Sequence, residues 1–137
     1  MGRFAFAGVA IIARSSWWTS AAWPDATQSS FVNGVAFVAT RLPPRSLMAF
    51  LLGLEAAFGR IRGEANASRT LDLDLIAYGR LVMRAHGLTL PHPRAQERGF
   101  VMGPLAQIAP DWRHPVSGER ADSLAAHTAI GRDARLL

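Results

Sequence analysis

The sequence predicts one α+β domain, a sandwich in which an antiparallel sheet carries its helices on one face. Its 137 residues fall within the roughly 100 to 200 residues of a single domain, so residues 1–137 are treated as one unit. Half of the residues are hydrophobic, which is enough to bury a sizeable core. The expected elements follow the order strand, strand, helix, strand, helix, and this order favours helices packed on an antiparallel sheet.

The first two strands are expected at Val9–Trp18 (VAIIARSSWW) and Phe31–Arg41 (FVNGVAFVATR). Both segments are rich in β-branched and aromatic residues. They pair antiparallel if the connection between them, Thr19–Ser30, folds back. That connection is long for a compact domain, and loops of this length are more often functional than idle.

A helix is expected next, because Pro43-Pro44 ends the second strand and Ser46 offers an N-cap. Gly59 stands where a C′ glycine would stop the helix. Between these signals apolar residues recur at helical spacing, at Leu47, Phe50, Leu51, Leu54 and Phe58.

Residues 69–79 (RTLDLDLIAYG) predict a third strand, because apolar and polar side chains alternate along them. Three leucines face one side of this strand, whereas Asp72 and Asp74 face the other. A short hairpin-like segment then leads from Gly79 to Gly87. The last predicted helix runs from about Phe100 to Ile108.

The pair Asp72 and Asp74 is the strongest chemical signal. Side chains two residues apart on a strand share a face, with Cα atoms about 6.5 to 7 Å apart, so they can share one or two hard cations. Magnesium is the cation expected at such a pair. The alternative, two carboxylates on the polar side of an amphipathic strand, is equally consistent with the bare pattern.

The charge balance favours an anionic partner. The formal net charge is +5, and all 15 basic residues are arginines. Nucleic acid and a nucleotide polyphosphate both fit such a surface, and a coding bias towards arginine would produce the same composition. Arg60, Arg62 and Arg69 lie on a polar stretch where they could clamp phosphate oxygens, although a solvated basic loop would look the same.

Other functional classes are excluded or disfavoured by composition. The chain has no cysteine, which removes disulfide scaffolds and thiolate zinc sites. Its longest apolar runs fall short of the roughly 20 residues that a membrane span requires. We therefore expect a soluble, cytoplasmic protein with no membrane partner.

A third chemical feature is the segment 91–100 (PHPRAQERGF). His92 and Arg98 could contact a phosphate, and Phe100 could stack on a flat ring. The alternatives are a packed or surface loop histidine and a phenylalanine that anchors the last helix in the core.

Four segments, FVNGV, GRIR, RTLDLDLIAYG and LPHPRAQERGFVMGPLAQIAP, together resemble the 6-hydroxymethyl-7,8-dihydropterin pyrophosphokinase family. The resemblance covers about residues 8 to 116. It implies a ferredoxin-like α+β fold and transfer of a pyrophosphoryl group from ATP to the pterin hydroxymethyl oxygen, with release of AMP. It also implies two magnesium ions, and partners that are small molecules rather than nucleic acid.

The resemblance assigns roles to individual residues. Asp72 and Asp74 would hold the two magnesium ions. The triphosphate would be contacted by Arg60, Arg62, Arg69, His92 and Arg98, with Glu55 near the nucleotide. The pterin would lie between Phe31 and Phe100, with Asn33 at its edge. Catalysis would depend on Asp72, Asp74, Arg69 and Arg60, and no general base is assigned.

The resemblance also predicts a strand and a Gly-Ser-Asn loop before Met1, so we expect an N-terminally truncated domain of marginal stability. Two alternatives remain open at this point: an inactive truncated copy, and a non-catalytic module that binds nucleotide or nucleic acid. The aspartate pair argues against a pure polyanion binder, because carboxylates repel phosphate unless a cation intervenes. The oligomeric state is left open.

Overall fold

The computed structural model describes residues 8–20, 31–62, 72–85, 87–128 and 133–136. Among these residues four strands precede the first helix, two more precede the later helices, and one follows them; each strand pairing is antiparallel, which confirms the predicted α+β class. The strands are β1 (Val9–Arg14), β2 (Trp18–Ser20), β3 (Phe31–Asn33), β4 (Ala36–Thr40), β5 (Met83–Ala85), β6 (Leu88–Leu90) and β7 (Arg135–Leu136). The helices are α2 (Pro44–Arg62), α3 (Gly99–Ile108), α4 (Ala121–Ala125) and a 3₁₀ turn, η1 (Ala95–Glu97). No helix among these residues is long and apolar enough to cross a membrane.

Each of the two predicted N-terminal strands is interrupted, and the prediction that the connecting loop begins at Thr19 is wrong, because β2 continues to Ser20. The longer halves, β1 and β4, pair antiparallel, with Val9 opposite Thr40. The shorter halves form a second sheet of order β3-β2-β7. At the break the Ser15 amide donates to the Val35 carbonyl (2.8 Å), while the Ser15 hydroxyl accepts from the Val35 amide (2.9 Å). A side chain thus satisfies the backbone where the chain leaves one sheet for the other.

Helix α2 is longer than predicted at both ends. It begins at Pro44, so Ser46 lies inside the helix and the prediction of an N-cap there is wrong. Proline suits the first turn because its missing N–H needs no partner there. The helix also continues through Gly59 to Arg62, so the predicted stop is wrong too. An interior glycine costs only about 1 kcal/mol relative to alanine, which leaves it short of a stop signal.

The prediction of a third strand at residues 69–79 is also wrong for residues 72–79, the part of it that the structure describes. Residues 72–78 form an irregular segment and belong to none of the three small sheets. The predicted alternation nevertheless holds locally, since Asp72 and Asp74 are exposed and Leu73 and Leu75 are half-buried. The hairpin that follows is β5–β6, and it turns at Gly87 with φ of 78°.

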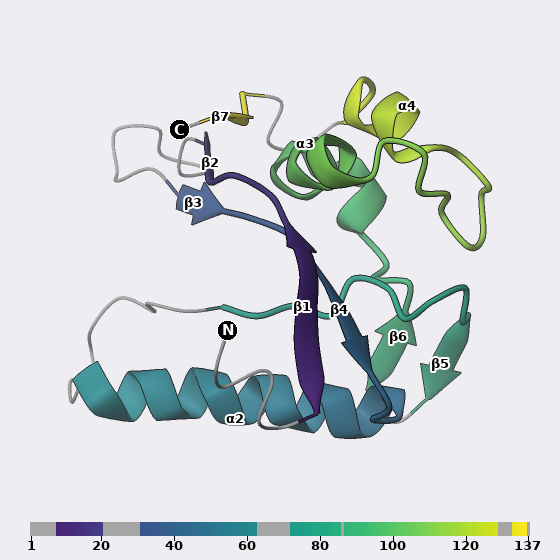
Figure 1. Cartoon of the computed structure of the whole chain (residues 1–137). Coiled ribbons are helices and arrows are strands. Elements are labelled where there is room, and N and C mark those ends of the chain that lie inside the picture. The colour runs from purple at the N-terminus through teal and green to yellow at the C-terminus, as the bar shows by residue number, and fades with distance from the viewer. Residues whose placement is uncertain (1–7, 21–30, 63–71, 86, 129–132, 137) are drawn as a thin grey trace.

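The main core lies in the C-terminal half. Helices α3 and α4 lie side by side in Figure 1, near one end of the β1–β4 pair, whereas α2 lies near the other end. Helix α3 starts one residue before the predicted Phe100 and ends at the predicted Ile108. Helix α4 was not predicted. Buried side chains join these helices to η1, in a cluster of Ala95, Val101, Met102, Leu105, Ala109, Ala121 and Leu124.

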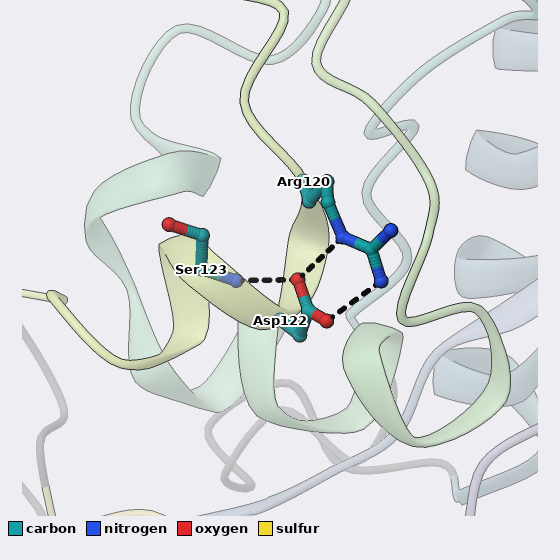
Figure 2. A network of polar contacts seen from close by, with 3 residues as sticks. All are labelled: Arg120, Asp122 and Ser123. Carbon is teal, nitrogen blue, oxygen red and sulfur yellow. Dashed lines mark hydrogen bonds and ion pairs between the residues drawn. The ribbon is translucent and has the colours of Figure 1, made fainter.

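The first turn of α4 is held by a surface network. Figure 2 shows the Arg120 guanidinium donating to both carboxylate oxygens of Asp122, at 3.0 and 2.9 Å. The same carboxylate accepts from the Ser123 amide at 2.8 Å. Hydrogen bonding to Arg120 lowers the pKa of Asp122. All three residues are exposed, so this network contributes little to stability and only orders the start of α4.

Candidate functional site

Three hydrogen bonds hold the segment 72–78 in place of a sheet. The Leu73 amide donates to the Glu55 carboxylate on α2. The Ile76 carbonyl accepts from the His92 amide at 2.7 Å, and the Tyr78 hydroxyl donates to the Leu42 carbonyl at 2.6 Å. Figure 1 shows this stretch running alongside α2 before it turns towards β5. The segment is thereby tied to the helix, to the chain just before it and to the 91–100 segment.

The two aspartates stand on the solvent side of this segment. Both are exposed, whereas Leu73 between them is half-buried. Their carboxylates fit magnesium, which usually takes one or two protein carboxylates and completes its shell with phosphate oxygens and water. Among the described residues no group of three or more acidic or histidine side chains could hold an ion. Two carboxylates suit a cation that completes its shell with phosphate oxygens and water.

His92 lies among charged neighbours. Burial lowers the pKa of His92, Arg98 lowers it further, and Asp74 opposes the shift. Its Nδ1 accepts from the Arg94 amide at 3.3 Å, which assigns the proton of the neutral ring to Nε2. The histidine is thus a neutral Nε2–H donor within the field of both an aspartate and an arginine.

The segment 91–100 brings Arg98 and Phe100 together. The guanidinium carbon of Arg98 lies 5.7 Å from the centroid of the Phe100 ring, a cation–π distance. Phe100 is half-buried and packs against the core cluster, so it anchors α3 and still offers part of its surface. The interpretation of Phe100 as a core anchor is confirmed, and its stacking on a flat ring stays a prediction.

Asn33 lies on β3, a strand that contacts α3 and pairs with β2. It is half-buried on β3, opposite Trp18 of β2, and α3 contacts both strands. The Trp18 indole lies so close to α3 that a Cβ at Gly103 would come within 2.6 Å of the ring. The indole N–H also donates to the Gln107 side-chain oxygen at 3.0 Å. These contacts, which sequence reasoning missed, fix the strand of Asn33 against the helix of Phe100.

Several expected site residues cannot be placed. Arg69 and the side chains of Phe31, Arg60 and Arg62 lie outside the described residues. The backbone at Arg60 and Arg62 belongs to the last turn of α2, so the predicted irregular segment at these two arginines is wrong. Among the described candidates, His92 is hydrogen-bonded through its amide to Ile76, close in sequence to Asp74, and Glu55 is hydrogen-bonded to Leu73.

The anchors of this site were missed for a common reason. Tyr78 and Leu42 are 36 residues apart, and Glu55 and Leu73 are 18 apart. No local pattern connects such positions. For the Trp18 contact a sequence signal existed in Gly103, because a glycine inside a predicted helix often has a packing reason.

The model of the 7,8-dihydro-6-hydroxymethylpterin-pyrophosphokinase family matches residues 3–110. A 2-amino-4-hydroxy-6-hydroxymethyldihydropteridine pyrophosphokinase of Synechocystis sp. is 46% identical over 113 residues, which are 82% of this chain and 57% of the relative. A protein of the same name from Methylorubrum extorquens is 38% identical over 104 residues, covering 76% of this chain and 66% of the relative.

A longer relative is the folic acid synthesis protein fol1 of Pneumocystis carinii. It is 41% identical over 91 residues, which are 66% of this chain and 12% of that protein. The aligned part of this chain corresponds to between 57% and 66% of the two bacterial relatives.

Proposed function

Because the chain belongs to the 7,8-dihydro-6-hydroxymethylpterin-pyrophosphokinase family, we propose that it transfers pyrophosphate from ATP to 6-hydroxymethyl-7,8-dihydropterin. The products are AMP and the pterin diphosphate, a step of folate biosynthesis. The observation that carries the proposal is the 2.7 Å hydrogen bond from the His92 amide to the Ile76 carbonyl, which brings the 91–100 segment beside the segment of the two exposed aspartates, Asp72 and Asp74. We further propose that the reaction takes place in the cytoplasm, with these two small molecules as its only substrates.

This grouping suits the chemistry of phosphoryl-type transfer. Such reactions ask a protein mainly to position the reactants and to neutralise charge. Asp72 and Asp74 would hold magnesium, for which we propose two ions, and bound magnesium would supply neutralisation of the triphosphate. Arg98 contributes a fixed positive charge, and the Nε2–H of His92 offers a neutral hydrogen bond to a phosphate oxygen.

The pterin is proposed to bind at the meeting of β3 and α3. Phe100 offers a ring surface for stacking, and the Asn33 amide can both donate to and accept from the polar edge of a pterin. Phe31 would cover the second face of the ring. Three further residues are proposed to contact ATP, namely Arg60, Arg62 and Arg69.

The decisive experiment measures AMP release and ATP binding on the same preparations. Wild-type protein should release AMP only when ATP, magnesium and the pterin are all present. The double variant Asp72→Asn/Asp74→Asn should lose the magnesium dependence of ATP binding in calorimetric titrations. The matched control is Asp111→Asn, an exposed aspartate outside the site.

Two results would contradict the proposal. Equal ATP affinity with and without magnesium, in both wild type and the double variant, would show that Asp72 and Asp74 do not hold magnesium for ATP. Tight ATP binding without AMP release on addition of the pterin would favour the alternative of a non-catalytic nucleotide-binding module.

A further inference from the structure

The hydrogen bond between Glu55 and Leu73 lies at the centre of the aspartate pair. Leu73 is the residue between Asp72 and Asp74, and its amide donates to Oε2 of Glu55. Glu55 is half-buried on α2, a helix of 19 residues. The Asp72–Leu73 peptide, one of the two peptides between the aspartates, is therefore hydrogen-bonded to a side chain of α2.

The hydrogen bond from Leu73 to Glu55 matters because the segment 72–78 is not paired with a strand in any of the three sheets. In a strand, neighbouring backbones would fix the direction of both aspartate side chains. Here the anchors at Ile76 and Tyr78 act two and four residues beyond Asp74. The Glu55 bond acts on the peptide directly between the aspartates, where a backbone rotation would swing both carboxylates.

The observed contact of Glu55 is with the backbone between the two aspartates. Its carboxylate accepts from a backbone N–H, and among the described residues it forms no cluster with the aspartates that could hold an ion. Glu55 is thus placed to orient the pair and not to coordinate with it.

We propose that Glu55 is a positioning residue, which holds the Leu73 peptide so that the carboxylates of Asp72 and Asp74 are preorganised for a cation shared with phosphate. The inference rests on the proposed magnesium-dependent binding of ATP. It assigns to Glu55 an action through Leu73 in place of the nucleotide contact that the family resemblance implies. Outer partners of metal ligands commonly change metal affinity by about 10- to 100-fold when they are removed.

The test compares Glu55→Ala with Glu55→Gln, because glutamine keeps an acceptor oxygen and alanine does not. Calorimetric titration of ATP at increasing magnesium gives the concentration for half-maximal binding. We expect Glu55→Ala to raise this concentration about tenfold, Glu55→Gln to stay within about threefold of wild type, and ATP binding without magnesium to be the same in all three. Glu119→Ala, which removes an exposed glutamate in the C-terminal half, is the matched control.

Amide hydrogen exchange supplies an independent readout of the tie itself. The Leu73 amide should exchange faster in Glu55→Ala than in wild type, while the amides of α3 stay protected. This measurement does not depend on turnover or on bound nucleotide.

Each contrary result overturns the inference. Equal losses in the alanine and glutamine variants would mean that the charge of Glu55 acts directly. Weaker ATP binding without magnesium would make Glu55 a nucleotide contact, and an unchanged magnesium requirement would leave it a stability residue only. Wild-type AMP release with no magnesium shift in Glu55→Ala would defeat this inference and leave the proposed function standing. The reverse pattern, a magnesium shift without AMP release, would defeat the proposed function alone.

Discussion

Two regions of the molecule are held together in different ways. The C-terminal helical region, residues 95–128, closes on a cluster of buried apolar side chains, with Met102 fully buried and Leu105 3% exposed. The segment 72–78 has no fully buried side chain and no strand partner, and hydrogen bonds to Glu55, His92 and Leu42 hold it. Apolar burial sets stability in the first region, whereas a few polar anchors set the geometry of the candidate site in the second.

The largest expected effect is in the helical region. Met102→Ala would leave a cavity in the core and should destabilise the protein by about 2 to 5 kcal/mol, as large-to-small core substitutions do. Urea unfolding followed by circular dichroism measures the change. Val116→Ala, at a side chain 67% exposed, should change stability by less than about 0.5 kcal/mol. A loss below about 1 kcal/mol for Met102→Ala would show that this cluster is not the main core.

A smaller effect is expected at the anchors of the site segment. Tyr78→Phe removes the hydroxyl that donates to Leu42, and one such hydrogen bond contributes about 0.5 to 1.5 kcal/mol to stability. We expect a stability loss in this range and a clear rise in the exchange rates of amides in residues 72–78. If exchange instead rose mainly in α3, the two regions would not be separable in the way described.

Phe100 sharpens the comparison because it serves both regions. Phe100→Leu keeps an apolar side chain against the core cluster but loses the ring, so pterin affinity should fall by about 1 kcal/mol, roughly fivefold, with ATP affinity unchanged. Fluorescence titration with the pterin and calorimetry with ATP measure the two affinities. Equal weakening of both ligands would indicate a core anchor without a stacking role.

The smallest effect is a pH dependence in the helical region. Burial lowers the pKa of His114, and its Nδ1 accepts from the amides of Val116 and Ser117, both at 3.2 Å. Between this lowered pKa and the unfolded value of about 6.5 the unfolded chain binds more protons. Stability should therefore be complete above about pH 6.5 and decline as the pH falls towards the folded pKa.

His114→Asn tests the cause of that decline. Asparagine can accept from amides two and three residues ahead without titrating, so thermal unfolding of this variant should lose less stability between pH 7 and pH 5 than wild type does. His127→Gln, at an exposed histidine, is the control. An identical pH profile for His114→Asn and wild type would remove His114 as the source.

The sequence by itself determined those features that depend on near neighbours. The apolar run before Pro110 predicted α3 to within one residue, and the alternation at Asp72 and Asp74 predicted two exposed carboxylates flanking a half-buried leucine. The antiparallel relation of the first two strands and the family also followed from the sequence. Side-chain periodicity and short motifs act over a few residues, so a sequence displays them directly.

Only the tertiary structure decided how the site is held. Whether residues 72–78 form a strand depends on a partner backbone, and here Glu55, Leu42 and His92 take the place of one. The continuation of α2 past Gly59 and the change of sheet at Ser15 were equally hidden, because tertiary packing overrides local propensity. Hydrogen bonds between residues 18 and 36 positions apart form only when packing brings their partners together, and no local pattern encodes that packing.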